Sequence, residues 1–319
     1  MANVLEEKVA IVTGAGRGIG RGVALLMAQE GARVVVNDIG ASLDGTGFDQ
    51  GPADQVVQEI QAAGGVAVAS YDSVATMEGG ERIVRTALDH FGRLDVLVTP
   101  HGILRDRMVF NMTEEEWDEV IQVHLKGTFT VVKHACIVMR QQRSGRIITF
   151  TSESGLVGNS GQANYGAAKS GIAGLTKVVA RDMGRYGVTV NSIAPRASTR
   201  MTAAVPDAVR QMRVERGIQG VVEEAQQFQQ WEPEAVAPLV VYLASDYAAG
   251  VNGQTFLAYG GVIALMSQPR LTRCIFKEGR WTPEELAERC PQYLTAGLPN
   301  PSPPQALYQT QPAGGSSDG

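Results

Sequence analysis

Short apolar segments alternate with longer segments of helical periodicity along most of the chain. The apolar segments are rich in β-branched residues and span 9–14, 33–38, 66–72, 94–99, 146–152, 188–194 and 255–261. Near-continuous apolar strands separated by helices are typical of a parallel sheet that is covered on both faces. The pattern therefore predicts an α/β fold: a single doubly wound Rossmann-type domain with a seven-stranded parallel sheet and helices on both faces.

Local signals mark the ends of several helical segments. One helix is expected from about Gly18 to Glu30, where a glycine follows, and a long one over 163–186. Thr113 and Glu116 have the spacing of a capping box, which predicts the start of another long helix.

The C-terminal part of the chain has a different composition. The segment WTPEELAERC (281–290) predicts a short helix with its own capping box, and the sequence after it is rich in Pro, Gly and Ser. We expect a main domain over 1–265, which includes a helical covering segment at 201–233, and an extension over 266–319 with a disordered end.

Composition and charge exclude several classes of partner. Charged residues make up 19% of the chain and the formal net charge is −5, without a run of Lys or Arg, which argues against a nucleic-acid partner. No apolar run is long enough to cross a bilayer, and the N-terminal residues do not have the pattern of a secretory signal. We therefore expect a cytoplasmic protein with no membrane partner.

The three cysteines, Cys136, Cys274 and Cys290, have no CxxC spacing, and the four histidines form no metal-binding motif. This usage indicates reduced thiols and no metal site.

A glycine-rich turn follows the first predicted strand and opens the first helix. In TGAGRGIG (13–20) the glycines let the backbone approach a pyrophosphate, whose charge suits a helix N-terminus. Asp38 ends the second strand, where a carboxylate accepts hydrogen bonds from the adenosine ribose and repels a 2′-phosphate. Asp38 favours NAD as the cofactor, with NADP the lesser alternative because Arg17 could meet a phosphate. The candidate cofactor-binding residues here are Gly14, Arg17, Gly18, Ile19, Gly20 and Asp38.

The stretch QANYGAAK (162–169) places Tyr165 and Lys169 on one face of a predicted helix. Taken alone, such a pair is most simply two surface side chains. Beside a nucleotide site, a partly desolvated ammonium would lower the phenol pKa from its ordinary value of about 10. We therefore expect the pKa of Tyr165 to be lowered.

Together these residues resemble the short-chain dehydrogenase/reductase family over about residues 5–265. Tyr165 and Lys169 match the family's YxxxK, and Ser152 lies thirteen residues before Tyr165, as in the family. The resemblance implies that Tyr165 moves the alcohol proton, Ser152 binds the substrate oxygen and Lys169 holds the nicotinamide ribose. It implies a homodimer or homotetramer, and 201–233 would cover a small-molecule substrate. It also adds cofactor-binding residues: Asp72, Ser73, Val74, Gly102, Tyr165, Lys169, Pro195 and Thr199.

Within the family, several stretches are similar to the (3R)-hydroxyacyl-CoA dehydrogenase of peroxisomal multifunctional β-oxidation enzymes. They are VVVNDIG, GILRDRM, VHLKGTF, GQANYGAAK, IAPRASTRMT and EAVAPLVVYL. That subgroup uses NAD, which agrees with Asp38.

The chain departs from the family pattern at three places. Thr99, Pro100 and His101 replace the side-chain amides that brace the turn after the fourth strand, and His101 is expected to be packed in the loop. His124 stands where most relatives have an asparagine that supports a water relay to the lysine, so it joins the catalytic candidates. Arg196 follows Pro195 in place of glycine, where it could attract an anionic substrate or face solvent.

Three functions follow from these observations. The first is an NAD-dependent oxidoreductase that acts on a 3-hydroxyacyl thioester or another bulky secondary alcohol. The second is a hydroxysteroid or polyketide-type ketoreductase. The third, from another class, is a nucleotide-binding sensor or scaffold without turnover, for which the altered turn at Thr99–His101 is the supporting feature.

Overall fold

The computed structural model describes residues 3–197 and 231–298 of the chain. Thr199 and most of the expected covering segment, 201–233, lie outside these residues, as does the end of the expected extension. The chain divides into two compact units, Met1–Ser267 and Gln268–Gly319. None of the described helices is long and apolar enough to span a membrane.

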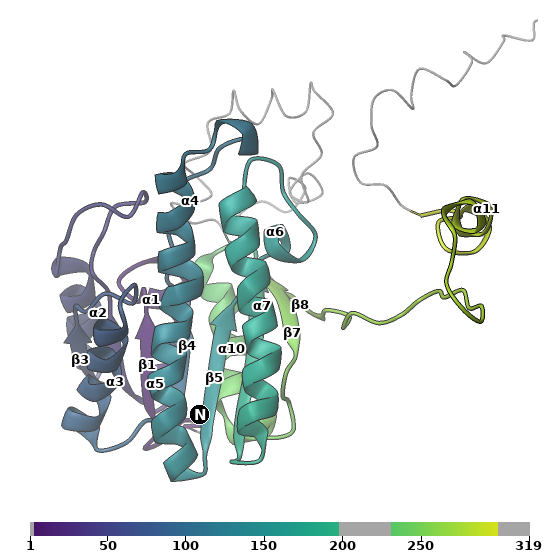
Figure 1. Ribbon diagram of the computed structural model, residues 1–319. Coiled ribbons are helices and arrows are strands. Elements are labelled where there is room, and N and C mark those ends of the chain that lie inside the picture. Colours follow the sequence, from purple (N-terminus) through teal and green to yellow (C-terminus); the bar gives the residue numbers. More distant parts are fainter. Residues whose placement is uncertain (1–2, 198–230, 299–319) are drawn as a thin grey trace, which may run out of the picture. The chain divides into compact units, whose positions relative to one another are not determined.

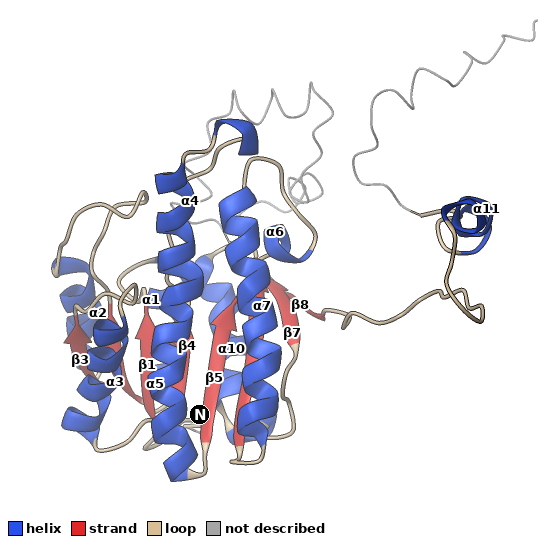
Figure 2. Ribbon diagram, viewed as in Figure 1, coloured by secondary structure: helices blue, strands red, loops and turns tan. Residues whose placement is uncertain are grey.

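The first unit is built on one twisted sheet (Figures 1 and 2). Its strand order is β3-β2-β1-β4-β5-β6-β7-β8. The strands are β1 Val9–Thr13, β2 Arg33–Asn37, β3 Val66–Ser70, β4 Val96–Thr99, β5 Gly145–Phe150, β6 Val188–Pro195, β7 Thr255–Tyr259 and β8 Val262–Leu265. The seven predicted strands are confirmed and pair in parallel, whereas β8 pairs with β7 in the antiparallel direction and was not predicted.

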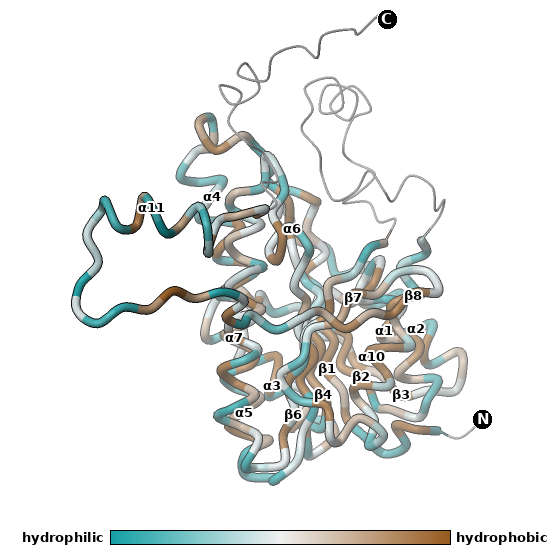
Figure 3. The backbone as a smooth tube through the Cα atoms, turned by 90° about the vertical axis from the view of Figure 1, so that its right-hand side faces the viewer, coloured by the Kyte–Doolittle hydropathy of each residue, from teal (hydrophilic) through white to brown (hydrophobic). Residues whose placement is uncertain are grey.

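Helices cover both faces of the sheet, as predicted. On one face lie α1 Gly18–Gln29, α2 Gly51–Ala62 and α10 Ala237–Ala244, and on the other α3 Met77–Phe91, α5 Gly127–Gln142 and α7 Ala163–Gly184. Successive side chains of a strand point to opposite faces, so Ala10 and Val12 of β1 enter one core cluster while Val9 and Ile11 enter the other. Figure 3 shows the hydrophobic strands enclosed at the centre of this unit.

The predicted capping boxes are confirmed. Thr113 and Glu116 form one at the start of α4 Glu114–Ile121, and Thr282 and Glu285 form another at α11 Pro283–Tyr293 in the second unit. Between α4 and α5 the chain forms a π-helical turn, Gln122–Lys126, so the three segments make one long rod. A further short helix, α6 Glu153–Leu156, follows β5.

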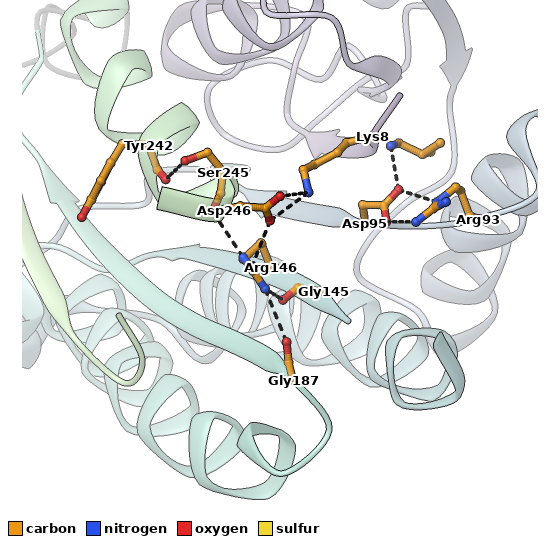
Figure 4. A network of polar contacts seen from close by, with 10 residues as sticks. Lys8, Arg93, Asp95, Gly145, Arg146, Gly187, Tyr242, Ser245 and Asp246 are labelled. Atoms are coloured by element: carbon orange, nitrogen blue, oxygen red, sulfur yellow. Dashed lines mark hydrogen bonds and ion pairs between the residues drawn. The ribbon is translucent and has the colours of Figure 1, made fainter. Parts of the chain in front are cut away.

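The amino ends of the strands are held by a network of charged side chains (Figure 4). Arg146 is only 9% exposed; it donates to the carbonyls of Gly145 and Gly187 and pairs with Asp246 at 3.3 Å. Lys8 reaches the same Asp246 carboxylate at 3.1 Å. Arg146 and Lys8 therefore both have hydrogen-bond acceptors at this edge.

Candidate active site

Most of the predicted site residues that the structure describes lie at the carboxyl ends of six parallel strands and therefore gather at one edge of the sheet, the upper edge in Figure 1. The strand order reverses between β1 and β4, and open α/β sheets bind ligands at such a switch point. The glycine turn after β1 and the turn after β4 lie on the two sides of this point.

The glycine turn is shaped by close approaches that a side chain would prevent. Gly14 has a φ of +60°, and a Cβ there would lie 2.7 Å from the Cα of His101. A Cβ at Gly20 would lie 2.1 Å from the carbonyl oxygen of Gly14. Nη1 of Arg17, at the start of α1, is buried without a hydrogen-bond partner among the described residues. A bare backbone at a helix N-terminus, beside an unsatisfied guanidinium nitrogen, fits an anionic diphosphate.

Asp38 is fixed beside this turn at the end of β2. Its two carboxylate oxygens accept hydrogen bonds from the amides of Gly16 and Gly40, at 2.8 and 2.7 Å. A pocket lined by Gly16, Arg17, Asp49, Gly51, Pro52 and Gln55 opens next to it. The carboxylate therefore keeps a defined position in the nucleotide region, and its remaining lone pairs can accept further hydrogen bonds.

The segment after β3 is ordered by its own contacts. The Asp72 carboxylate pairs with Arg82 at 2.5 Å, and the carbonyl of Asp72 accepts from the Asn37 side chain at 2.9 Å. The carbonyl of Val74 accepts from the hydroxyl of Thr130 at 2.6 Å. Ser73 accepts from the amide of Ala75. These bonds hold the three predicted residues of this segment in one turn.

The turn after β4 has a brace that the sequence did not reveal. Nδ1 of His101 lies 2.6 Å from the hydroxyl of Thr13, at the end of β1. Burial, together with the charge of Lys169, lowers the pKa of His101 to about 3, so its ring is neutral. At 7% exposure His101 is packed, as expected, and it ties the turn to the glycine-rich segment.

Ser152, Tyr165 and Lys169 come together between β5 and α7. Ser152 caps α6 by accepting from the amide of Ser154 at 3.2 Å, and its hydroxyl interacts with the Tyr165 phenol and lowers the pKa of that group. Nζ of Lys169 lies 5.6 Å from the centroid of the Tyr165 ring and donates to the carbonyl of Phe150 at 2.8 Å. The predicted sharing of one helix face by Tyr165 and Lys169 is confirmed.

The expectation of a lowered tyrosine pKa is wrong when only the side chains of this protein act on Tyr165. Burial and the charge of Asp106 raise the pKa of Tyr165 to about 12, against a smaller lowering by the Ser152 hydroxyl. Burial also lowers the pKa of Lys169 to about 7. The reason is that Tyr165 and Lys169 are both removed from solvent. Burial disfavours the charged form of each group, so the amine loses part of the positive charge that would have stabilised a phenolate.

His124 lies against Tyr165 from the π-helical turn. Its ring is 1% exposed and meets the tyrosine ring edge-on, with 5.1 Å between centroids. Nε2 contacts the backbone of Ile103, with the carbonyl oxygen at 2.8 Å. Burial holds the pKa of His124 well below its ordinary value. A Cβ at Gly102 would lie 2.1 Å from the His124 ring, so this glycine makes room for the imidazole.

Asn164, which precedes Tyr165, was not among the predicted site residues. It is fully buried; its side-chain amide donates to the carbonyls of Arg105 and Glu116, both at 2.9 Å, and its oxygen accepts from the Tyr165 amide at 2.7 Å. Asn164 thereby fixes the first turn of α7 against α4. An asparagine in the first turn of a helix was the available signal, because such residues satisfy backbone groups there.

Neither alternative foreseen for Arg196 describes its environment. Arg196 follows Pro195 at the end of β6, and its guanidinium holds the Glu153 carboxylate with two bonds of 2.5 and 2.6 Å. Its side chain is 18% exposed, so it neither extends into solvent nor presents an unpaired charge.

Comparisons with known proteins agree with this arrangement. The profile of a family described as enoyl-(acyl carrier protein) reductase matches residues 14–263. Hydroxyacyl-CoA dehydrogenase ChsB1 of Mycobacterium tuberculosis is 42% identical over 311 residues, covering 93% of this chain and 92% of that protein. Peroxisomal multifunctional enzyme type 2 of Mus musculus is 40% identical over 309 residues, covering 96% of this chain but 39% of the mouse protein.

A solved structure described as a short chain dehydrogenase from Mycobacterium avium matches with a TM-score of 0.75 and 46% identity, covering 89% of this chain and 93% of that chain. The extent and identity of these matches show the family, and the family implies an enzyme that binds NAD(P) and acts on a small molecule. The glycine turn and the unsatisfied Arg17 nitrogen fit such a cofactor. The chain belongs to the short-chain dehydrogenase/reductase family of oxidoreductases that act on CH–OH groups.

Proposed function

We propose that this enzyme transfers hydride between NAD and the secondary alcohol carbon of a 3-hydroxyacyl thioester. The observation that carries the proposal is that the Lys169 amine lies 5.6 Å from the centre of the Tyr165 ring, the same phenol with which the Ser152 hydroxyl interacts. The thioester substrate is inferred from the relatives named hydroxyacyl-CoA dehydrogenase and peroxisomal multifunctional enzyme type 2.

The residues divide the work of moving one proton. Bound NAD supplies the hydride acceptor, which is chemistry that no side chain provides. Tyr165 takes the hydroxyl proton during oxidation and returns it during reduction. Ser152 donates a hydrogen bond to the substrate oxygen as charge develops on it. Lys169 holds the nicotinamide ribose and, when protonated, favours the phenolate, while His124 packs against the phenol ring and keeps its orientation.

The cofactor assignment rests on the glycine turn and on Asp38. With its oxygens held by two amides, the Asp38 carboxylate has a fixed place from which it can accept hydrogen bonds from ribose hydroxyls and repel a 2′-phosphate, which favours NAD over NADP. The other residues proposed to bind the cofactor are Gly14, Arg17, Gly18, Ile19, Gly20, Asp72, Ser73, Val74, Gly102, Tyr165, Lys169, Pro195 and Thr199. A cytoplasmic location and assembly as a homodimer or homotetramer remain predictions.

The test is turnover of a substrate panel by the purified full-length chain, followed by absorbance of the reduced nicotinamide. The panel contains (3R)- and (3S)-3-hydroxyacyl-CoA, a hydroxysteroid and a simple secondary alcohol, each with NAD and with NADP. We expect the highest kcat/KM with a 3-hydroxyacyl-CoA and NAD. A hydroxysteroid as the best substrate, or NADP as the better cofactor, would contradict the respective part of the proposal.

A further inference from the structure

An ion pair joins two strand ends that carry different parts of the candidate site. Glu153 directly follows Ser152 and begins α6, whereas Arg196 directly follows Pro195, the last residue of β6. The two charged residues are 43 positions apart in the sequence, and their side chains are 16% and 18% exposed. The ion pair therefore connects the segment that carries Ser152 to the end of β6, where the nicotinamide is proposed to bind.

The guanidinium of Arg196 is confined on its other side by aromatic rings. It lies 4.8 Å from the centroid of Tyr259, at the end of β7, and 6.0 Å from that of Trp231. The two rings are themselves 4.9 Å apart. A bidentate carboxylate in the plane of the guanidinium and a ring over its face leave an arginine few alternative positions.

The other contacts of α6 lead to α7. Ser154 donates to the side chain of Gln162 at 2.8 Å, and the hydroxyl of Ser170 donates to the carbonyl of Gly155. These bonds orient α6 along α7, and the amide of Thr151 ties the residue before Ser152 to the carbonyl of Ile193 in β6 at 2.9 Å, so a side-chain contact from α6 to the end of β6 would act on the turn at Ser152 itself. Glu153 and Arg196 supply such a contact, directly beside Ser152.

We propose that Glu153 and Arg196 form a positioning pair, which holds the Ser152 hydroxyl in register with Tyr165 and with the end of β6. The pair acts through Ser152 and touches no reacting atom. This inference rests on the catalytic role proposed above for Ser152 and Tyr165. It assigns to Arg196 a mechanical function in place of the recognition of an anionic substrate.

The first measurement needs no substrate. Incorporation of tyrosine labelled with ¹³C at Cζ gives a resonance for Tyr165 that is identified by its loss in Tyr165→Phe. Because the Ser152 hydroxyl interacts with this phenol, Ser152→Ala should shift the resonance. We expect Arg196→Gln and Glu153→Gln to shift it in the same direction, and Arg196→Lys to shift it less because the charge is kept.

The second measurement is a double-mutant cycle on the single-turnover rate of hydride transfer. Each single variant should lower this rate about tenfold, and the double variant should also lower it about tenfold because the two residues act as one unit. The dissociation constant of NADH, measured by fluorescence, should change by less than about twofold, because the glycine turn is untouched. Arg85→Gln, which removes an exposed pair with Glu81 on α3, is the matched control and should leave both readouts unchanged.

Two outcomes would overturn the inference. An unshifted Tyr165 resonance in both Glu153→Gln and Arg196→Gln means that the pair does not position Ser152. If the double variant lowers the rate by the product of the two single-variant reductions, the two residues act separately. Failure of the wild type to oxidise any thioester contradicts the proposed substrate alone, because the resonance test does not depend on turnover and the cycle can be run with any alcohol that the wild type oxidises.

Discussion

The two edges of the sheet treat buried charge in opposite ways. At the amino edge, Arg146 is bound to carbonyls and to Asp246, and the Asp95 carboxylate accepts from Arg93 and from a strand amide (Figure 4). At the carboxyl edge, Lys169 is 4% exposed and forms no ion pair in the described part of the chain, and His124 is buried beside it.

The difference separates stability from reactivity. A buried cation with a full set of partners keeps its charge and holds elements together, whereas one without a carboxylate changes its pKa toward neutrality. Groups that change protonation near neutral pH are those that proton transfer needs. Lys169, with a pKa lowered to about 7, belongs to the second kind.

The largest effect is expected from Tyr165→Phe. The variant removes the proposed proton carrier, and general acid–base groups contribute about 10²- to 10⁴-fold in rate. We expect kcat to fall by that amount while NADH binding, measured by fluorescence, and the melting temperature stay close to wild type. If Tyr165→Phe keeps more than half of the wild-type kcat, Tyr165 is not the proton carrier and the chemical role proposed for the carboxyl edge is wrong.

Arg146→Met tests the other edge. The variant leaves the carbonyls of Gly145 and Gly187 without this donor, whereas the exposed Asp246 carboxylate keeps Lys8, and a buried hydrogen-bonding group left without its partner costs about 1–3 kcal/mol. The free energy of unfolding, measured with urea, should fall by this amount, and kcat of the folded protein should stay nearly unchanged. Arg85→Met, which removes an exposed ion pair, is the control. An equal loss of unfolding free energy in both variants would mean that the Arg146 network stabilises the fold no more than a surface ion pair does.

Lys169→Met should give the opposite change in stability. Because the pKa of Lys169 is lowered from 10.5 to about 7 on folding, the unfolded chain binds the extra proton between these values, and stability should rise with pH across that interval. Removing the amine should stabilise the fold at pH 7 by roughly 1–4 kcal/mol and flatten the pH dependence, while turnover is lost. Lys133→Met, at an exposed position on α5, is the control.

A destabilised Lys169→Met variant would show that the bond from Nζ to the carbonyl of Phe150 outweighs the cost of burying the amine. The comparison between the edges would then concern function alone.

The smallest effect is expected from His101→Ala, which removes the contact with Thr13. A hydrogen bond of this kind contributes about 0.5–1.5 kcal/mol, so NADH binding should weaken by about 2- to 12-fold. His101→Asn should restore part of the affinity because it keeps a polar atom near Thr13. Unchanged affinity in His101→Ala, with the exposed His90→Ala as control, would show that the glycine turn needs no brace.

The features that the sequence predicted are local ones. The seven parallel strands were visible as short apolar runs, and the helix starts at Thr113 and Thr282 as capping boxes. β8, Val262–Leu265, is also a short apolar run, but it was missed because it follows β7 after two glycines, with no helix between them, and so falls outside the alternation of strands and helices. The Gly260–Gly261 pair between two apolar runs was the available signal for its antiparallel pairing with β7, because such a pair is typical of a hairpin turn.

In the site, the residue types were predictable but their partners were not. The YxxxK spacing placed Tyr165 beside Lys169, yet the direction of the tyrosine pKa depends on how much water both groups lose. The contact of His101 with Thr13 joins positions 88 residues apart. No periodicity along a chain reports such contacts.

The π-helical turn at Gln122–Lys126 limits where insertions and deletions can be tolerated in the sequence. Such a turn holds one residue more than an α-helical turn, and each helical residue advances the rod by about 100°. Deleting a single residue there would swing Val131 and Met139 of α5 away from the core and turn His124 from Tyr165. Insertions and deletions in this stretch should therefore be selected against, because one change would disturb both the core packing of α5 and the contact of His124 with Tyr165.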